Sequence, residues 1–342
     1  MDFSVIIPAY NCESSIAKTV KSICDVQIEE MEIIIVDDGS TDNTSNECKS
    51  LAGQYPLVRY YYQDNQGVSA ARNFGISKAI GNFILFWDSD DKADTELLKK
   101  CMLTAKEKNA DVLMFGMTFY KLYNGTPFQI EYLQCEKEER INKNELGSRM
   151  IDLFQKNYLT PVWNKVFKSE IVHRTFFNSS KMCFEDFLYS LEFLRHCDSV
   201  YLMPDPAYIY RMEHSSHKNV REKRINDFNE YMSDFQTAVI DLESHLGLEL
   251  TEFRLKIGLV YEWMLISKLK AGNYGELKRL DKNKMKLTLF GNEFVSSSKI
   301  IRLFFDNKLI TLRLYSFFHN IRHRIGLRMR CRKYRLKKTR KN

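Results

Sequence analysis

The hydrophobic and polar positions of the first hundred residues alternate between two patterns. Short, almost continuous apolar runs predict buried strands, and the segments between them carry apolar residues at helical spacing, as at Ile16, Val20 and Ile23. Continuous apolar strands that alternate with helices are typical of an α/β fold with a largely parallel sheet covered on both faces. Four strands are expected here, in the segments FSVIIPAY from residue 3, MEIIIVDDGS from 31, LVRYYYQ from 57 and NFILFWDSD from 82.

The pattern changes twice beyond this region. Residues 111–220 mix loops, a helix and short strands, of which DVLMFGMTFY is the clearest. Residues 221–342 have a helical pattern, rich in charged and aromatic side chains, with few Gly and Pro. The sequence therefore predicts three parts, with boundaries near residues 110 and 220.

Polar residues follow three of the expected strands, at the point where each strand ends. These residues are 8–11 (Pro-Ala-Tyr-Asn), 37–40 (Asp-Asp-Gly-Ser) and the acidic group at 88–91. In open α/β sheets ligands bind beyond the carboxyl ends of the strands, near the point where the strand order reverses. We therefore expect the three groups to converge on one cleft.

The acidic group consists of Asp88, Asp90 and Asp91, directly after a buried strand. Carboxylates this close to one another make each other harder to ionise. Helix capping does not explain three of them, because a single Asp is sufficient to cap a helix. Mg²⁺ or Mn²⁺ typically takes one or two protein carboxylates together with phosphate oxygens. The cluster therefore predicts a cation bridging a diphosphate. Neither GxGxxG nor GxxxxGK[ST] occurs near these strands, which weakens dinucleotide and P-loop hypotheses.

Composition places the chain among folded proteins. Its 342 residues are 44% hydrophobic and 28% charged, which is ordinary for a soluble globular protein. The start, MDFSVIIPAY, lacks the basic residues and long apolar run of a secretory signal, and no apolar run of about 18 residues predicts a membrane-spanning helix. The eight Cys are scattered without a CxxC pair, so reduced thiols and a cytoplasmic location are expected.

The charge of the chain is unevenly distributed. Residues 302–342 hold 14 Lys or Arg and one acid, a net charge of +13, so the remaining residues sum to −6 of the total of +7. The tail interleaves these cations with Leu, Phe, Tyr and Ile, as an interfacial helix on an anionic membrane does. A helix packed on the body with a frayed basic end is the alternative. Nucleic-acid binding lacks an accompanying recognition motif.

Four segments carry a resemblance to a known family. VIIPAYN (5–11), IIIVDDGSTDNT (33–44), NQGVSAARNFGI (65–76) and FWDSDD (86–91) occur in order, and together they resemble the nucleotide-binding half of inverting family 2 glycosyltransferases with the GT-A fold. Shorter segments later in the chain, VWNKVFK, FED and YIYR, are also similar to family elements.

The resemblance implies a Rossmann-like GT-A sheet flanked by helices, with a helical C-terminal extension. Residues 1–110 would be the nucleotide-sugar-binding half, 111–220 the acceptor-binding half and 221–342 the helical extension with the basic tail.

The resemblance also implies roles for individual residues. Asp38 would accept a hydrogen bond from the base, such as a uracil N–H, and Arg72 would be a charge partner of the nucleotide-sugar. Asp88 and Asp90 would form an Asp-x-Asp element that contacts donor and metal, with Asp91 as a further ligand of metal or ribose. Four residues would border the base and the ribose: Pro8, Ala9, Tyr10 and Asn11.

Catalysis would use a carboxylate across the cleft. Asp186 matches the family's catalytic base, although Glu185 is adjacent. Trp163 and Lys165 would contact the acceptor and a phosphate, or instead be a core side chain and a solvated or ion-paired one. A further group would close over the diphosphate or have a structural role: Arg211, His214 and His217.

The implied activity is metal-dependent hexosyl transfer, with Mn²⁺ or Mg²⁺, from a UDP-sugar to a glycan or lipid-linked acceptor in surface-polysaccharide synthesis. The enzyme would be cytoplasmic, in peripheral contact with the anionic inner face of the plasma membrane through its tail. No nucleic acid is expected as a partner. The alternatives are a sugar-nucleotide nucleotidyltransferase on a related fold and, from a different class, a basic nucleic-acid-binding protein.

Overall fold

A computed structural model describes most of the N-terminal two thirds of the chain. The described residues are 1–123, 126–179, 184–213 and 228–254. The basic tail at 302–342, and with it the expectation of an interfacial helix, lies outside the described residues, as do His214 and His217.

The chain divides into two compact units, each of which is described by itself. Unit 1 consists of Met1–Phe119 and Glu131–Arg211. Unit 2 contains Tyr120–Ile130 and the described residues from Met212 onward. The expected domain boundaries near 110 and 220 remain predictions.

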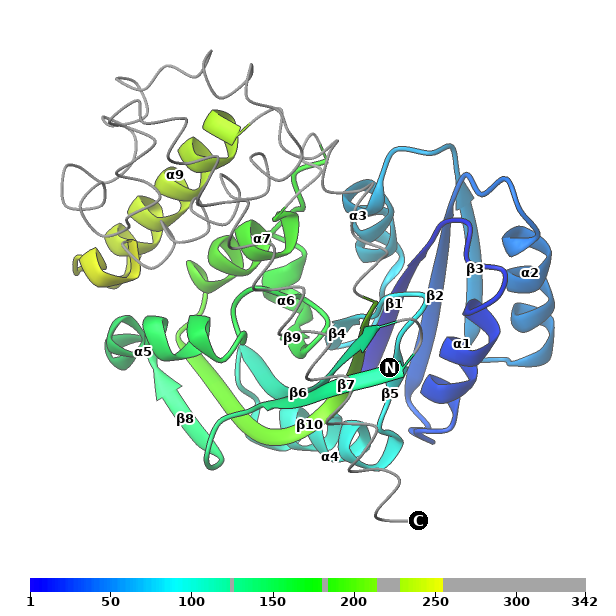
Figure 1. Ribbon diagram of the computed structural model, residues 1–342, viewed down its shortest axis with the longest axis horizontal. Helices are drawn as coiled ribbons and strands as arrows, with labels where there is room; N and C mark the ends of the chain where they lie inside the picture. Colours follow the sequence, from blue (N-terminus) through cyan, green and yellow to red (C-terminus); the bar gives the residue numbers. More distant parts are fainter. Residues whose placement is uncertain (124–125, 180–183, 214–227, 255–342) are drawn as a thin grey trace. The chain divides into compact units, whose positions relative to one another are not determined.

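Unit 1 is built on one β-sheet with helices on both faces (Figure 1). The strands of the described residues are β1 (Phe3–Ala9), β2 (Met31–Asp38), β3 (Val58–Gln63), β4 (Phe83–Phe86), β5 (Lys92–Ala93), β6 (Val112–Tyr123), β7 (Thr126–Leu133), β8 (Glu139–Asn142), β9 (Lys165–Lys168) and β10 (Ser199–Glu213). The helices are α1 (Ile16–Cys24), α2 (Thr44–Gln54), α3 (Val68–Lys78), α4 (Thr95–Lys108), α5 (Lys143–Gln155), α6 (Ser169–Val172), α7 (Glu185–Leu194) and α9 (Phe228–Leu246).

The strand order places the three polar strand ends side by side. It runs β3-β2-β1-β4-β9-β6-β10-β5, with β7 paired to β6 and β8 to β10. The half formed by β3, β2, β1 and β4 is parallel, whereas β9 pairs antiparallel with β4 and β6, and β10 pairs antiparallel with β5 and β8. The predicted α/β fold with a mostly parallel central sheet flanked by helices is confirmed. The order reverses at β1, where ligand sites form in such sheets.

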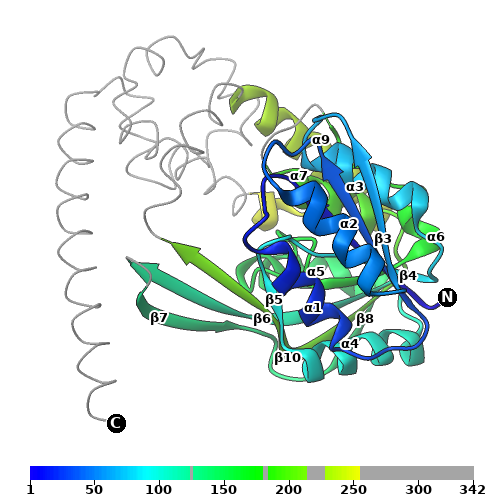
Figure 2. The same cartoon turned by 90° about the vertical axis from the view of Figure 1, so that its right-hand side faces the viewer.

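The central strand β1 is buried on both faces, which explains its unbroken apolar sequence. Val5 and Ile7 point into the core cluster that includes residues of α1 and α4. Ile6 points to the opposite face, where Gly75 of α3 packs directly against it. Figure 1 shows α2 and α3 on opposite sides of the parallel half, and Figure 2 looks onto α1 and α2. A parallel sheet covered in this way has no face for an alternating polar pattern.

Pro8 marks the point where β1 leaves its neighbour β4. The β1–β4 ladder ends with the pair Ile6 and Phe86, after which Trp87 N donates to Ile6 O at 2.9 Å. Alternate residues of a strand direct their backbone polar groups toward the same neighbouring strand, so Pro8, two residues after Ile6, faces β4. The β1–β4 ladder has already ended at this point, so the N–H that proline lacks is not needed for a ladder hydrogen bond. The chain after β4 is therefore free to turn outward as the acidic loop.

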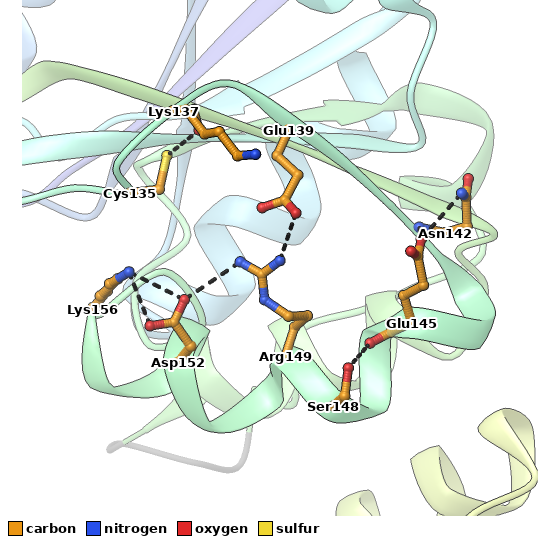
Figure 3. A network of polar contacts seen from close by, with 9 residues as sticks. All are labelled: Cys135, Lys137, Glu139, Asn142, Glu145, Ser148, Arg149, Asp152 and Lys156. Carbon is orange, nitrogen blue, oxygen red and sulfur yellow. Dashed lines mark hydrogen bonds and ion pairs between the residues drawn. The ribbon is translucent and has the colours of Figure 1, made fainter.

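Polar caps fix the ends of the longer helices. Asp94 caps α4 by accepting from Leu97 N at 3.2 Å. Asn142 and Glu145 form a capping box at the start of α5, and one turn further Arg149 reaches Glu139 of the preceding strand at 2.8 Å (Figure 3). These contacts join β8 to α5 within unit 1 and fix the direction in which the chain leaves the sheet edge.

Unit 2 contains the helix α9, in the part of the chain where a helical pattern is expected. Leu242 of this helix is buried, and Glu243 accepts from Leu250 N at 2.6 Å and pairs with Arg254. Within the described residues no helix has the length and apolarity needed to cross a bilayer. The six described cysteines are free thiols.

We predict that Gly75→Ala destabilises the protein by about 1–3 kcal/mol, because a Cβ at this position would overlap Ile6 Cγ2 in a filled core. Gly53, on α2, is a matched control: a Cβ there meets nothing within 4 Å, so Gly53→Ala should stabilise by about 0.5–1 kcal/mol. Denaturant unfolding of both variants measures the difference. Equal effects would show that α3 is not packed on β1 as described.

Candidate active site

The first two polar loops are joined by Asn11. Its Oδ1 accepts from Thr41 N at 2.8 Å, and its own N–H donates to Ser40 Oγ at 3.0 Å. Asn11 has a φ of 47°, a left-handed conformation that Asn tolerates better than most residues. Beside it the Tyr10 ring is 51% exposed. The loop thus presents an aromatic face to solvent at the carboxyl end of β1, as expected for residues that border a nucleotide.

Asp38 connects the end of β2 to the loop before α3. Its Oδ1 accepts from Gln63 Nε2 at 2.7 Å and from Gln66 N at 2.9 Å, while Oδ2 accepts from Gly67 N at 2.8 Å. Gly67 has a φ of 90° and immediately precedes α3. Asp38 therefore fixes where α3 begins. Its expected contact with a base remains a prediction.

The three carboxylates of the acidic loop have different surroundings. Asp88 is part-buried, and its Oδ1 lies 3.1 Å from Arg72 Nη2. Asp91 is only 5% exposed and accepts from Tyr208 OH at 2.7 Å. Asp90 between them is exposed and, within the described residues, makes no hydrogen bond or ion pair. The chain therefore provides partners for two of the three carboxylates and leaves the third open to solvent.

Arg72 links this loop to the expected catalytic base. Its Nη1 lies 2.5 Å from Asp186 Oδ1 and 3.9 Å from Glu185 Oε1, while Nη2 binds Asp88. The Arg72 side chain is 3% exposed, and its burial lowers the pKa of the guanidinium. The charges of Asp186, Asp88 and Glu185 raise this pKa by more, so that it lies above its usual value. Arg72 was expected to pair with the nucleotide-sugar. In the structure its guanidinium joins carboxylates from two segments far apart in sequence, and its contact with the nucleotide-sugar remains a prediction.

The electrostatics of the loop favour a cation. Burial raises the pKa of Asp88 to about 6, with Asp186 and Asp90 acting in the same direction and Arg72 in the opposite one. Burial also raises the pKa of Asp91 to about 8, and the Asp88 charge adds to this shift. A single guanidinium therefore does not fully offset the negative charge. A bound divalent cation would favour the ionised carboxylates.

The donor set of the loop fits Mg²⁺ or Mn²⁺. Asp90 has an exposed carboxylate that, within the described residues, forms no hydrogen bond or ion pair. Two residues earlier in the chain, Asp88 accepts from Arg72 through its Oδ1. Among the described residues, no three His, Cys, Asp or Glu are grouped so as to hold a metal by themselves. A cation here needs further oxygen ligands, which a diphosphate supplies. Metal binding by Asp88, Asp90 and Asp91 remains a prediction.

Two residues near Asp186 were not singled out from the sequence. Asn73, next to Arg72 on α3, grips the backbone of Phe177 from both sides: Nδ2 donates to its carbonyl at 2.8 Å, and Oδ1 accepts from its N–H at 2.9 Å. The Phe177 ring stacks on Tyr189 of α7, with centroids 3.9 Å apart, and lies 5.3 Å from the Arg72 guanidinium carbon. Asn73 lies in the segment NQGVSAARNFGI (65–76), whose resemblance to a family element does not indicate these partners.

Trp163 and Lys165 lie in the core. Trp163 stacks on Tyr208 with centroids 3.8 Å apart. Lys165 is 1% exposed, and its Nζ donates to Asn164 Oδ1 at 3.0 Å and to the Pro161 carbonyl. Burial lowers the pKa of Lys165 to about 7, although the Asp186 charge acts to raise it. Lys165 is therefore not solvated, and within the described residues it forms no ion pair. Its contact with a phosphate remains a prediction.

Comparison with known proteins agrees with this geometry. The family model described as glycosyl transferase family 2 matches residues 4–196, more than half of the chain. The uncharacterized glycosyltransferase EpsJ of Bacillus subtilis is 27% identical over 72% of this chain and 70% of its own length. Glycosyltransferase GlyA of Streptococcus pneumoniae is 27% identical over 72% of this chain, which spans 36% of that protein.

Among solved structures, S. aureus TarS in complex with UDP-GlcNAc has a TM-score of 0.67 to this chain. It is 20% identical, and the match covers 94% of this chain and 92% of that one. A second TarS structure, in complex with UDP, has a TM-score of 0.59. At this level of identity the likeness shows the shared GT-A fold.

We predict that Arg72→Met destabilises the protein by roughly 3 kcal/mol, the lower end for breaking a buried ion pair, because the carboxylates left behind keep some contact with solvent. Arg174→Met is the matched control. Its guanidinium lies 3.0 Å from Glu170 in an exposed pair, so its loss should change the free energy of unfolding by less than about 0.5 kcal/mol. Denaturant unfolding at pH 7 compares the two, and equal losses would contradict the buried bridge.

Proposed function

The chain belongs to glycosyltransferase family 2, and on this basis we propose that it transfers a sugar from a UDP-sugar to a glycan or lipid-linked acceptor with inversion at the anomeric carbon. The observation that carries the proposal is that Asp186 and Asp88 meet on one buried guanidinium. A carboxylate suited to activate an acceptor thus stands beside the loop suited to hold a donor diphosphate.

The donor would bind across the carboxyl ends of β1 and β2. The exposed Tyr10 ring and the loop fixed by Asn11 would border the base and ribose together with Pro8 and Ala9. Asp38, at the end of β2, would face the base. The TarS structures support a uridine donor, because TarS has the same fold and was solved with UDP-GlcNAc and with UDP. The identity of the sugar is not part of the proposal.

Asp90 and Asp88 would hold Mn²⁺ or Mg²⁺ together with the donor phosphates. When bound, such an ion supplies Lewis-acid stabilisation of the charge that develops on the leaving diphosphate. Asp90 contributes an open carboxylate, and Asp88 contributes one that Arg72 already orients.

Asp186 would act as the general base. It lies in the first turn of α7, and its Oδ1 is held by Arg72 while the side chain keeps some exposure to solvent. From this position it would take the proton of the acceptor hydroxyl as that oxygen attacks the anomeric carbon. Attack from the side opposite the leaving diphosphate inverts the anomeric centre.

Two substitutions separate the proposed roles. With UDP and Mn²⁺ the wild-type melting temperature should rise further than with UDP alone. Asp90→Ala should lose this Mn²⁺-dependent increment, while Asp186→Asn keeps it. UDP release from a panel of UDP-sugars, with a lipid extract as acceptor, should fall roughly 10²–10⁴-fold in Asp186→Asn, because general-base catalysis contributes that much.

Asp25→Ala serves as the control for this pair, because Asp25 forms an exposed ion pair with Lys21 at the end of α1 and should leave both measurements unchanged. Retention of the Mn²⁺ increment by Asp90→Ala would contradict the metal role. A reaction that releases or consumes pyrophosphate instead of UDP would favour the nucleotidyltransferase.

The acceptor side of the proposal includes contact with the cytoplasmic face of a membrane. It rests on the net charge of +13 in residues 302–342 and on the apolar residues interleaved there. Each cation near an anionic leaflet contributes about 1 kcal/mol, so a few of them give measurable binding. A surface-polysaccharide pathway, with its lipid-linked intermediates, is the proposed setting.

Cosedimentation of the full chain with anionic vesicles tests this contact, and neutral vesicles are the control. Binding should fall by more than about tenfold when six cations are changed to Gln, because each contributes about 1 kcal/mol. Preference for RNA over anionic vesicles would instead favour the nucleic-acid-binding alternative. The six positions are Arg328, Arg330, Arg332, Lys333, Arg335 and Lys337.

A further inference from the structure

Asp91 is the carboxylate of the acidic loop that turns into the protein. Its side chain is buried, whereas that of the neighbouring Asp90 is exposed. Oδ2 accepts from Tyr208 OH at 2.7 Å. Tyr208 belongs to β10, more than a hundred residues further along the chain. Asp91 therefore ties the loop to a distant strand.

The backbone of the same loop is held at two more points. Thr19 Oγ1, on α1, lies 2.9 Å from the Ser89 carbonyl oxygen and 3.1 Å from that of Asp91. Directly after Asp91 the short strand β5 pairs antiparallel with β10, with Ala93 opposite Tyr208. The residues on either side of Asp90 are thus attached to α1 and β10, while the Asp90 side chain itself stays free.

Tyr208 is a rigid partner for Asp91. Its ring is fully buried and stacks on Trp163 with centroids 3.8 Å apart and planes at 17°. The ring of Trp87, the residue that precedes the acidic loop, lies 4.5 Å from the Tyr208 ring, with the two planes tilted by 43°. A hydroxyl fixed by two packed indoles can hold a carboxylate in one place, because neither the ring nor its neighbours have room to shift.

We propose that Asp91 is a positioning residue, which with Tyr208 fixes the acidic loop so that Asp90 faces the donor diphosphate and its cation, and that Asp91 is not itself a cation ligand. This inference rests on the proposed function, because it assigns the loop's carboxylates within that site. Each carboxylate then has a different partner: Asp88 binds Arg72, Asp91 binds Tyr208, and Asp90 is available to bind the cation.

The alternative, that Asp91 turns outward to bind the cation, conflicts with its surroundings. Such a turn would leave the Tyr208 hydroxyl buried without its acceptor, and buried polar groups without partners are costly. It would also add a third carboxylate where Mg²⁺ or Mn²⁺ typically takes one or two alongside phosphate oxygens. Groups that orient a metal loop without touching the metal still affect its affinity, commonly by 10–100-fold when removed.

Mn²⁺ binding in the presence of UDP, followed by the electron paramagnetic resonance signal of free Mn²⁺, distinguishes the two roles. Tyr208→Phe keeps the stacked ring and removes only the hydroxyl, so it should weaken Mn²⁺ binding by about 10-fold. Asp91→Asn should have a similar effect, and the double variant should be no worse than either, because both break one contact. Asp90→Asn should weaken binding by more than about 100-fold.

Tyr201→Phe is the matched control on the same strand. Its hydroxyl donates to Glu138 Oε2 at 3.2 Å, in a pair that involves none of the acidic loop, and its removal should leave Mn²⁺ affinity unchanged. The proposal is overturned if Asp91→Asn weakens binding as much as Asp90→Asn while Tyr208→Phe matches the wild type.

Amide hydrogen exchange across residues 86–94 without metal supplies a readout that does not depend on the proposed function. Exchange should accelerate at least about threefold in Tyr208→Phe, because the loop loses its tie, and should not change in Asp90→Asn or Tyr201→Phe. Unchanged exchange in Tyr208→Phe would overturn the positioning role. If the wild type fails to bind Mn²⁺ with UDP, the proposed metal site is wrong, and the exchange data alone decide whether Tyr208 holds the loop.

Discussion

A single buried guanidinium is the constraint on which the arrangement of the site depends. Arg72 binds Asp88 through one terminal nitrogen and Asp186 through the other, with Glu185 close by. The planar fork of Arg can bind two carboxylates at once, which a Lys ammonium on its flexible stem does with far less geometric definition. Removing this cation would leave carboxylates from both halves of the site facing one another with no compensating charge. The separation between Asp88, in the loop proposed to bind the donor, and Asp186, the proposed base, is therefore set by the dimensions of one side chain.

This constraint also explains how a chain can place three carboxylates side by side. Each carboxylate has a different partner that lessens the repulsion between them. These partners are the Arg72 guanidinium for Asp88, the buried Tyr208 hydroxyl for Asp91 and solvent for Asp90. Two of the three are then fixed and one remains available. If all three carboxylates were mobile, ordering them would reduce the free energy gained when a cation binds. Contacts with α1, α3 and β10 already order this loop before binding.

The sequence was sufficient for the parts of the site that local pattern determines. Continuous apolar runs identified the parallel strands, and because strand ends converge in such a sheet, Asp38 and the acidic loop were placed correctly at one edge. The partners of these residues could not be predicted, because Arg72 with Asp186 and Asp91 with Tyr208 are separated by more than a hundred residues. Lys165 shows the same limit: its charge suggested solvent or phosphate, and only the packing of β9 between β4 and β6 determines that it is buried.

The position of α3 then decides how the two halves of the site are coupled. The helix begins where Asp38 holds the preceding loop, and Gly75 lets it lie directly on β1. From this fixed helix Arg72 reaches Asp186, and its neighbour Asn73 grips the backbone of Phe177, which in turn stacks on α7. Two consecutive residues of one helix therefore anchor both Asp186, the proposed base, and the segment that leads to it. The segment proposed to bind the acceptor can vary in sequence and shape without moving Asp186, provided that these two anchors and the packing of α3 on β1 are kept.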